Sequence, residues 1–434
     1  MKSDSALEIF PMTTGVGKDG NLTLAGVDLF SLAKTWGTPL YLYDSVTVRR
    51  QVSILEQALK DHYPAKAQVC YAAKAYFSSG LAVHLKQMGV DVDTVSLGEM
   101  MVARKAGFRG SQVHLHGNNK SRAELEMAIT WGIQSIVVDS LDELDFLGTI
   151  ASGLGAPVRI WLRITPGIEV DTHPYRQTGH SASKFGLSIE DNQAGLAIQK
   201  AKANPWLTLT GLHFHLGSQS FDPTPYRRGI MALYHLAETQ DFIPTQFSPG
   251  GGWGVRYTAD DPADDVKPWV AGISETVCEV CRRLGWPLPE LLLEPGRSLI
   301  ARAGLALYSV GAQKQLPDGC KVLALDGGMA DNPRPALYQS RYTALRVRQP
   351  YLGERSPMRL VGRFCESGDE LIHEVLLPEV QRGDLIAIPT AGAYQLSMSS
   401  NYNLTPRPAV LWVEDNKVEC IQAREPDECG PWWG

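Results

Sequence analysis

Short apolar runs alternate with longer amphipathic segments through the middle of the chain, from about residue 66 to residue 294. The runs are rich in Val, Ile and Leu and have the length of buried strands, whereas the segments between them carry apolar residues at helical spacing. Eight runs follow this pattern: 68–72, 90–95, 112–115, 135–138, 158–164, 209–216, 244–249 and 290–293.

An alternation of strands and helices favours parallel βα units, in which each helix carries the chain back to the start of the next strand. Eight such units over about 250 residues have the size of a closed (β/α)8, TIM-like barrel. The pattern therefore predicts an α/β barrel domain over residues 47–302.

The sequence on either side of the predicted barrel has the pattern of a β domain, in which short strands are joined by turns. Five strand-like runs joined by turn-rich loops follow the barrel: 305–310, 321–325, 359–363, 385–389 and 409–413. Two N-terminal runs, 22–25 and 40–43, also read as strands, and the piece that contains them is too short to fold alone. We expect it to join the same sheet, so that residues 1–46 and 303–434 form a β-sandwich or barrel-like domain.

Composition and charge narrow the choice of partners. The 434 residues are 44% hydrophobic and 20% charged, as in a soluble globular protein. A net charge of -6 without a long basic block argues against binding to nucleic acid. No apolar stretch approaches the roughly 18 residues of a membrane span, no secretory leader is recognisable, and seven scattered cysteines do not make a disulfide framework. We expect a cytoplasmic protein with a small-molecule partner and no membrane contact.

Polar residues interrupt the apolar pattern where the predicted strands end, which is where barrels of this kind carry their chemistry. Lys74 follows the first strand, and Asp93 and Glu99 end the second. The other strand ends carry His116-Gly117-Asn118-Asn119-Lys120, His215-Leu216-Gly217-Ser218, Gly250-Gly251-Gly252 and Glu294. This alignment predicts an active site at the C-terminal mouth of the barrel.

Two of these segments, Gly250-Gly251-Gly252 and Glu294-Pro295-Gly296-Arg297, together predict an anion site with a carboxylate beside it. Backbone amides and an arginine bind a phosphate. Glu294 would repel that phosphate unless the same ligand also carries a positive group. Pyridoxal phosphate meets this condition, because it has a phosphate at one end and a protonatable ring nitrogen at the other.

Lys74 and His215 each have a structural alternative. Lys74 could simply extend its charged end out of the barrel, but beside the cofactor aldehyde a partly desolvated lysine can form a Schiff base. His213 and His215 alternate along the expected strand and should share a face. We expect one of them to be a hydrogen-bonded interior histidine, and His215, nearer the strand end, to lie against the cofactor ring.

The His-x-His pairs, His114 with His116 and His213 with His215, raise a rival function, that of a metal-dependent barrel hydrolase. No aspartate ends the eighth strand, and the glycine cradle would remain unexplained. We therefore expect no metal site.

Longer motifs resemble the fold-type III pyridoxal-phosphate-dependent amino acid decarboxylases, the group that acts on ornithine, diaminopimelate and arginine. The resemblance covers nearly the whole chain, from Gly37 to Asn403. The matching segments are Gly37-Thr38-Pro39-Leu40-Tyr41-Leu42-Tyr43-Asp44, Tyr71-Ala72-Ala73-Lys74-Ala75, His116-Gly117-Asn118-Asn119-Lys120-Ser121, His215-Leu216-Gly217-Ser218-Gln219, Glu294-Pro295-Gly296-Arg297, Arg334-Pro335-Ala336-Leu337-Tyr338, Cys365-Glu366-Ser367-Gly368-Asp369, Ala391-Gly392-Ala393-Tyr394 and Ser399-Ser400-Asn401-Tyr402-Asn403.

The resemblance implies a role for each matching residue. Lys74 would hold pyridoxal phosphate as a Schiff base, with His215 stacked on the ring and Glu294 paired with the ring nitrogen. The phosphate would be bound by Ser218, Gly252, Gly296, Arg297 and Tyr394. The substrate would be bound by Arg297, Arg334, Tyr338, Glu366 and Tyr394. Cys365 would donate a proton into the neighbouring subunit's site, which implies a homodimer.

Arg334 decides the expected substrate. Its structural alternative is a surface salt bridge of small value, but a guanidinium also fits a distal carboxylate in a bidentate manner. We therefore expect decarboxylation of meso-diaminopimelate to L-lysine, the last step of lysine biosynthesis. Decarboxylation of ornithine, lysine, arginine or a specialised diaminopimelate-like compound remains the alternative. An amino acid racemase is disfavoured, because racemases of this fold usually place an arginine, not a glutamate, near the ring nitrogen.

Two positions depart from the family pattern. Ser248-Pro249 stands where Asp-Leu is usual, and the proline is expected to stiffen the phosphate turn. Leu97 stands where glycine is usual, and leucine does not readily adopt a positive φ. We therefore expect a local backbone difference after the second strand.

Overall fold

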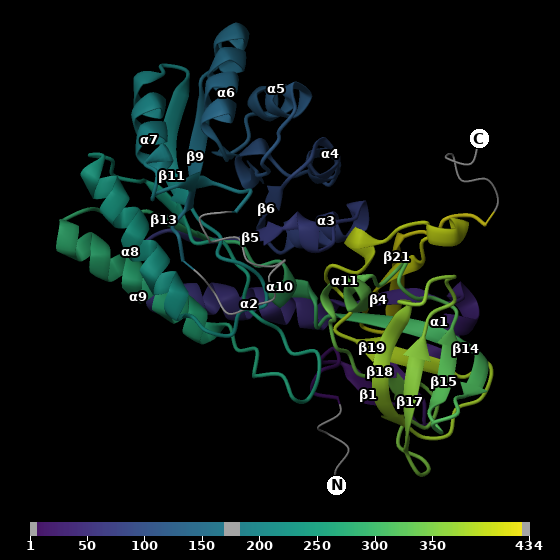
Figure 1. Cartoon of the computed structure of the whole chain (residues 1–434). Helices are drawn as coiled ribbons and strands as arrows, with labels where there is room; N and C mark the ends of the chain where they lie inside the picture. Colours follow the sequence, from purple (N-terminus) through teal and green to yellow (C-terminus); the bar gives the residue numbers. More distant parts are fainter. Residues whose placement is uncertain (1–6, 169–182, 428–434) are drawn as a thin grey trace. The chain divides into compact units, whose positions relative to one another are not determined.

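The computed structural model describes residues 7–168 and 183–427, and the chain divides into two compact units (Figure 1). The barrel unit comprises residues 52–254 and 264–298, and the β unit comprises residues 1–51, 255–263 and 299–434. This division differs from the boundaries expected at residues 47 and 302. Residues 255–263, expected within the barrel, belong to the β unit.

Eight parallel strands close into a ring in the barrel unit, which confirms the predicted TIM-like barrel (Figure 1). Hydrogen-bonded neighbours follow the chain order, and the last strand pairs with the first; a short strand, β10 (Leu187–Ser188), pairs with β9 outside the ring. The ring consists of β5 (Ala67–Ala72), β6 (Asp91–Thr94), β7 (Val113–Leu115), β8 (Ser135–Val138), β9 (Val158–Thr165), β11 (Leu207–His213), β12 (Gln246–Ser248) and β13 (Glu290–Leu293).

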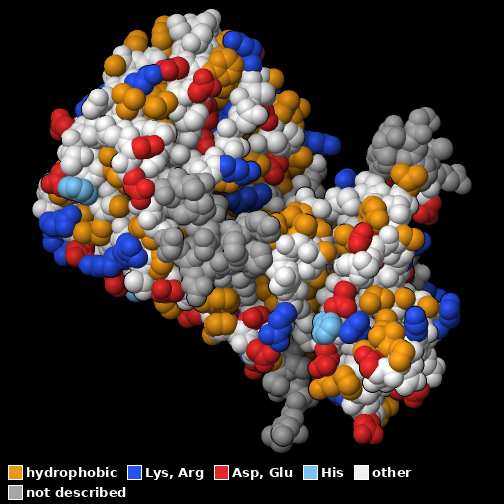
Figure 2. Space-filling view, viewed as in Figure 1, with side chains coloured by type: hydrophobic (Ala, Val, Ile, Leu, Met, Phe, Trp, Pro, Cys, Tyr) orange, Lys and Arg blue, Asp and Glu red, His pale blue; other side chains and the backbone are white. Residues whose placement is uncertain are grey.

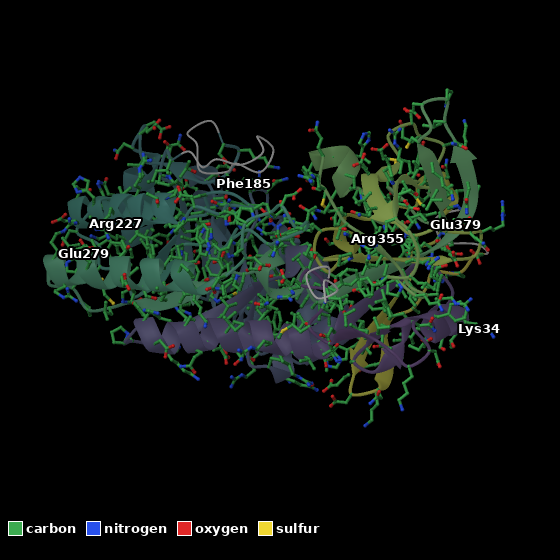
Figure 3. The ribbon with its side chains drawn as sticks, turned by 90° about the horizontal axis from the view of Figure 1, so that it is seen from below. Lys34, Phe185, Arg227, Glu279, Arg355 and Glu379 are labelled. Atoms are coloured by element: carbon green, nitrogen blue, oxygen red, sulfur yellow. The ribbon has the colours of Figure 1, made fainter. Side chains whose placement is uncertain are left out.

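Helices alternate with the barrel strands along the chain, beginning with α2 before β5. They are α2 (Ser45–His62), α3 (Ser79–Gln87), α4 (Leu97–Lys105), α5 (Arg122–Trp131), α6 (Leu141–Leu154), α7 (Gln193–Ala203), α8 (Thr224–Thr239), α9 (Lys267–Leu284) and the short α10 (Arg297–Ile300). Ser121 and Glu124 form a reciprocal capping box at the start of α5. Arg227 of α8 and Glu279 of α9 are joined by an exposed ion pair of 2.9 Å (Figure 3), which contributes little stability.

The barrel interior contains one unusually close contact. Trp161 of β9 packs with Val137 and Leu292 and donates its indole N–H to Gln246 Oε1 at 3.0 Å. A Cβ atom on Gly211 of β11 would lie 2.6 Å from the Trp161 ring and 2.9 Å from the Gln246 carbonyl oxygen. Glycine is therefore required at position 211 for the indole to pack against the strand.

The β unit is built on a nine-stranded sheet in the order β18-β17-β15-β14-β4-β20-β21, with β19 pairing β14 and β16 pairing β19. Its strands are β4 (Leu40–Asp44), β14 (Gly304–Gln315), β15 (Lys321–Leu325), β16 (Leu345–Arg346), β17 (Ser356–Val361), β18 (Glu370–Leu377), β19 (Leu385–Pro389), β20 (Ala409–Glu414) and β21 (Lys417–Gln422). Leu40, Leu42, Leu305, Leu307 and Leu411 from this sheet lie in one buried core.

The N-terminal runs do not both join this sheet. The run at 40–43 becomes β4, between β14 and β20. The run at 22–25 becomes β2 (Leu22–Leu24) in a separate sheet with β1 (Thr14–Val16) and β3 (Val27–Asp28), so that part of the prediction is wrong. Ala25 and Gly26 both have positive φ and form a two-residue hairpin turn. This turn folds β3 back onto β2, so β2 pairs with its neighbours in sequence and not with the main sheet. Helix α1 (Leu29–Trp36) follows β3 and contributes Leu29 to the shared core.

Acidic and basic side chains are interspersed on the face shown in Figure 2. Within residues 7–168 and 183–427, no helix has the combination of length and apolar character that crossing a bilayer requires.

Replacing Gly211 with alanine should destabilise the barrel by about 1–3 kcal/mol, because the added methyl group overlaps the Trp161 ring. The urea midpoint followed by tryptophan fluorescence measures the effect. The matched control is Gly153→Ala in α6, where no atom lies within 4 Å of the new Cβ, and alanine should stabilise the helix by up to about 1 kcal/mol. Equal midpoints for the two variants would contradict the packing argument.

Candidate active site

Lys74 lies in a turn of 3-10 helix, η1 (Ala73–Ala75), directly after β5. Its side chain is exposed, because the turn carries the lysine beyond the buried strand end. Its charge nevertheless acts on Asp93, Glu99 and His215. Lys74 therefore shares one end of the barrel with these groups.

Glu294 directly follows β13 and is 7% exposed. Ser248 Oγ donates to its Oε1 at 2.7 Å, and His213 Nε2 lies 3.0 Å from its Oε2. His116 Nε2 lies 3.7 Å from Oε1. Both carboxylate oxygens thus face polar groups from other strands, which is what a buried charge requires.

Asp93, the third residue of β6, is a second buried carboxyl group beside Glu294. Its Oδ1 lies 3.8 Å from His116 Nε2 and has no hydrogen-bond partner in the part of the chain that the structure describes. Burial and the charge of Glu294 raise the pKa of Asp93 well above its ordinary value. Burial opposes ionisation of Glu294 too, but His213, His116 and Ser248 hold the pKa of Glu294 well below its usual range. Their different surroundings thus favour a protonated Asp93 and an ionised Glu294.

The glycine triplet forms a tight turn that is tied to Glu294. The backbone N–H of Glu294 donates to the Gly250 carbonyl at 3.0 Å. Gly250 and Gly252 have φ of 73° and 100°, and a Cβ on Gly252 would lie 1.9 Å from the Gly217 carbonyl oxygen. Only glycine permits this approach, so the two segments that predicted a phosphate site lie together.

Arg297 and Ser218 add side-chain donors near the same turn. Arg297 is 7% exposed, and its Nη2 donates to Ser218 Oγ at 3.0 Å. Ser218 follows Gly217, the residue that contacts Gly252. Gly296 is buried between β13 and Arg297. Amides, a hydroxyl and a guanidinium of this kind form a donor set that is suited to phosphate.

The two histidines of the sixth strand have different environments. The strand β11 ends at His213, so the expected extension to residue 216 is wrong. The Phe214 N–H still donates to the Ser248 carbonyl at 3.1 Å, but the Gly250 N–H that would continue the parallel ladder donates to Ser248 Oγ instead. His213 is the hydrogen-bonded interior histidine. His215 lies against the glycine turn, since a Cβ on Gly250 would be 2.8 Å from its Nδ1.

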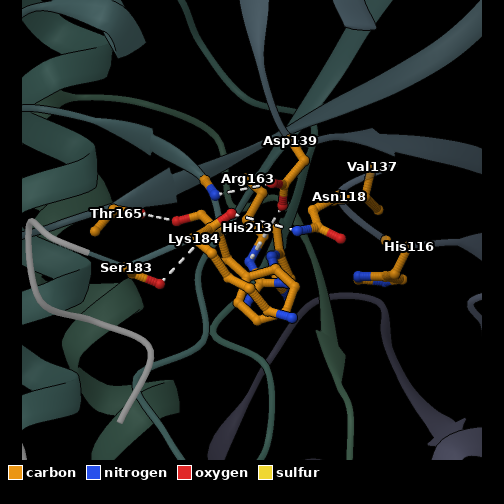
Figure 4. Close-up of polar contacts among 12 residues, drawn as sticks. His116, Asn118, Val137, Asp139, Arg163, Thr165, Ser183, Lys184 and His213 are labelled. Atoms are coloured by element: carbon orange, nitrogen blue, oxygen red, sulfur yellow. Dashed lines mark hydrogen bonds and ion pairs between the residues drawn. The ribbon is translucent and has the colours of Figure 1, made fainter. Parts of the chain in front are cut away.

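Arg163, Asp139 and Phe185 were missed by the sequence analysis. Arg163 Nε lies 3.8 Å from Asp139 Oδ1, and the guanidinium lies over the Phe185 ring at 4.3 Å (Figure 4). The charge of Arg163 also acts on Glu294 and Asp93. The available signal was Arg163 itself, because a buried parallel strand seldom carries a charged residue.

Arg334 begins α11 (Arg334–Tyr338) in the β unit and is 1% exposed, so the surface salt-bridge alternative is wrong. Its guanidinium lies 4.5 Å from the centre of the Tyr257 ring and 5.6 Å from that of Tyr342, and Nη1 donates to the Tyr342 hydroxyl. No carboxylate among the described residues forms an ion pair with it. Tyr257 and Tyr342 were not found from sequence.

Cys365 and Glu366 lie in the exposed loop between β17 and β18. Cys365 is therefore not a buried cysteine at a strand end. Buried Asp369 anchors the loop by accepting the N–H groups of Met329 at 2.6 Å and Phe364 at 2.8 Å.

The remaining two predicted site residues also lie in the β unit. Tyr338 ends α11 and is half-buried. Tyr394 follows β19 with a φ of 58°, in the left-handed region, and is half-buried.

One ligand atom each of His116, His213 and Glu294 lies within 4.8 Å of the others, so these residues could hold a metal ion. The sequence analysis did not predict this convergence of the third, sixth and eighth strands. In the described structure, the Glu294 oxygens already contact Ser248 and His213. His213 thus contacts one oxygen of the Glu294 carboxylate and Ser248 contacts the other.

Leu97, the departure expected to alter the backbone after the second strand, lies at the start of a helix. It is the first residue of α4, with Ser96 as the N-cap, and it does not have a positive φ. Its N–H donates to Glu124 Oε1 at 3.0 Å. A helix start accommodates leucine without strain.

Residues 46–301 match the family model described as pyridoxal-dependent decarboxylase, pyridoxal binding domain. The chain belongs to the pyridoxal-dependent decarboxylase family. The resemblance predicted from its motifs is thereby confirmed. A diaminopimelate decarboxylase from Bacillus subtilis is 41% identical over 417 residues, which are 95% of each chain.

Solved structures of this decarboxylase family agree with the fold of both units. Diaminopimelate decarboxylase from M. jannaschii in complex with L-lysine has a TM-score of 0.90 at 30% identity and covers 96% of each chain. The Helicobacter pylori enzyme, also complexed with L-lysine, has a TM-score of 0.84 at 33% identity, over 92% of this chain and 97% of its own.

The residues present fit the family's cofactor. The glycine turn leaves no room for side chains beside Arg297 and Ser218, as a phosphate site requires. The backbone of Glu294 is bonded to the same turn, and its carboxylate is linked to it through Ser248 Oγ. A ligand with an anionic end and a cationic end matches this pair of groups.

The pH dependence of barrel stability should reflect His114, whose pKa burial lowers to about 4. Its Nδ1 is bonded to Ser135 Oγ at 2.7 Å. In the unfolded chain the imidazole takes up a proton below about pH 6.5, so stability is complete above that pH and falls by up to about 3 kcal/mol as the pH drops towards 4. Urea midpoints should fall less steeply in His114→Gln, and exposed His235→Gln should match the unmodified chain. Parallel curves for all three proteins would contradict this.

Proposed function

We propose that this chain is a diaminopimelate decarboxylase, which converts meso-diaminopimelate to L-lysine and CO2 with bound pyridoxal phosphate. The observation that carries the proposal is Glu294, a buried carboxylate that its neighbours keep ionised and that is tied to a glycine turn. A second support is the similarity, over nearly the full length, to enzymes of that name.

Each predicted cofactor residue takes a defined part in this proposal. Lys74 binds the cofactor aldehyde covalently, and His215 lies against the ring. Glu294 faces the ring nitrogen. The phosphate is held by Ser218, Gly252, Gly296, Arg297 and Tyr394. The donor set around Gly252 supports these assignments.

Bound pyridoxal phosphate supplies an electron sink for the pair released when the bond to the departing carboxylate breaks. The ionised Glu294 favours a proton on the ring nitrogen, which strengthens that sink. Cys365 gives its thiol proton to the carbon that has lost CO2. One carboxylate leaves as CO2 and one proton replaces it, which yields lysine.

Arg334 binds the distal carboxylate of the substrate in this proposal. A buried guanidinium without a carboxylate partner among the described residues suits an anionic ligand. Arg297, Tyr338 and Tyr394 contact the substrate, and Glu366 binds its amino end.

The alternative substrates, ornithine, lysine and arginine, lack a distal carboxylate and would leave Arg334 unmatched. A diaminopimelate-like compound with both carboxylates would fit equally well. The cluster of His116, His213 and Glu294 supports the metal-hydrolase alternative. That alternative gives no function to the glycine turn.

We also infer a cytoplasmic homodimer in which Cys365 and Glu366 serve the partner's site. The support is the exposed loop that carries both residues, anchored through Asp369.

The proposal is tested by CO2 release from meso-diaminopimelate, lysine, ornithine and arginine, measured with the unmodified protein and with Arg334→Lys. Only meso-diaminopimelate should react, and the chelator EDTA should not change the rate. Arg334→Lys keeps the charge but loses the planar fork, so KM for meso-diaminopimelate should rise at least about tenfold, with a smaller change in kcat.

Arg341→Lys is the matched control, because Arg341 is exposed and paired with Asp260 at 2.8 Å. Its kinetics should equal those of the unmodified protein. Release from ornithine or arginine alone would overturn the substrate assignment. Loss of activity in EDTA, restored by a divalent metal, would favour the hydrolase.

Lys74 should carry the cofactor, so the purified protein should be yellow, and borohydride should bleach it and leave a pyridoxyl group on the peptide containing Lys74. Lys74→Ala should lack the absorption band, while Lys66→Ala, an exposed lysine paired with Glu290 at 2.6 Å, should retain it. A pyridoxyl group on another peptide would remove Lys74 from this role.

A further inference from the structure

Ser248 stands immediately before Pro249 and the glycine triplet and is fully buried. Its Oγ donates to Glu294 Oε1 at 2.7 Å. The same oxygen accepts the backbone N–H of Gly250 at 3.1 Å. This position departs from the family pattern, so its role does not follow from the resemblance.

The two bonds fix the direction of the hydroxyl proton. An ionised carboxylate can only accept and a backbone N–H can only donate, so the Ser248 O–H points to Glu294 and a lone pair of its Oγ accepts the Gly250 N–H. His213 Nε2 lies 3.0 Å from the other oxygen, Oε2. The carboxylate of Glu294 is therefore held at both ends, and a hydrogen bond to a charged group is stronger than one between neutral groups.

A third bond closes the arrangement into a ring. The backbone N–H of Glu294 donates to the Gly250 carbonyl at 3.0 Å. Ser248, Gly250 and Glu294 are thus linked in a circuit that contains both the Glu294 side chain and the glycine turn. The spacing between the carboxylate and the anion-binding turn is set by this circuit.

We propose that Ser248 is a positioning residue, which keeps the Glu294 carboxylate ionised and at a fixed separation from the glycine turn, so that one ligand can place a phosphate and a protonated ring nitrogen against the two. This inference rests on the proposed function. Ser248 acts through Glu294 and touches no reacting atom.

A second buried serine in the same barrel, Ser135, provides a comparison. Ser135 is as deeply buried as Ser248, and its Oγ bonds to His114 Nδ1 at 2.7 Å. Among residues 7–168 and 183–427, its side chain forms no hydrogen bond to Glu294 or to the glycine turn. Ser135→Ala is therefore a matched control for Ser248→Ala.

The test uses full-length protein reconstituted with pyridoxal phosphate labelled with 15N in the ring. The ring nitrogen of the unmodified protein and of Ser135→Ala should show the chemical shift of a protonated pyridine. In Ser248→Ala the shift should move towards the neutral value as the pH is raised from 6 to 9. The dissociation constant for the cofactor should rise about tenfold, and kcat should fall while KM changes little.

The outcomes separate this inference from the proposed function. If the unmodified protein does not bind the labelled cofactor, the proposed function fails. If it binds with a protonated ring and Ser248→Ala gives the same shift at every pH, Ser248 has no positioning role. Should Ser248→Ala fail to fold, Ser248→Cys keeps a side chain with a weak donor and should give an intermediate shift; a shift equal to that of the unmodified protein would overturn the inference.

Discussion

The buried, ionised carboxylate of Glu294 is the constraint on which the barrel site depends. A charge removed from water is stable only when donors replace the lost hydration. The groups that face this carboxylate come from His116 after β7, His213 at the end of β11 and Ser248 at the end of β12. They meet only because the ring closes in one register, in which His213 lies beside Ser248. The charge state of Glu294 therefore depends on the register in which the barrel closes.

The same end of the barrel contains a second carboxyl group with the opposite protonation state. Asp93 is buried beside a charge of its own sign and has a raised pKa, whereas Glu294 has a lowered one. The two groups differ in environment and not in type. The Glu294 carboxylate thus lies near backbone amides and the Arg297 guanidinium, which favour an anion. This separation of charges suits a ligand that is anionic at one end and cationic at the other.

The β unit contains a buried cation, the guanidinium of Arg334. Arg334 is buried without a carboxylate partner among the described residues, and it is held by the rings of Tyr257 and Tyr342 and by the Tyr342 hydroxyl. Aromatic faces stabilise a guanidinium without neutralising it. Its charge is therefore not balanced by an ion pair among the described residues. The loop that carries Cys365 is instead exposed and is positioned by the buried carboxylate of Asp369.

The sequence alone determined the barrel, the cofactor class and the family, because these depend on local patterns. Strand and helix periodicity, the glycine triplet and the Glu294 motif can each be read within a few residues. Tertiary structure alone decided that β2 leaves the main sheet, that β11 ends at His213 and that Leu97 begins a helix without strain. It also revealed the contacts of Arg163, Tyr257 and Tyr342 and the two hydrogen bonds of Ser248. These features depend on hydrogen bonds and ring contacts between residues far apart in the chain, and such contacts leave no periodic signal in the sequence.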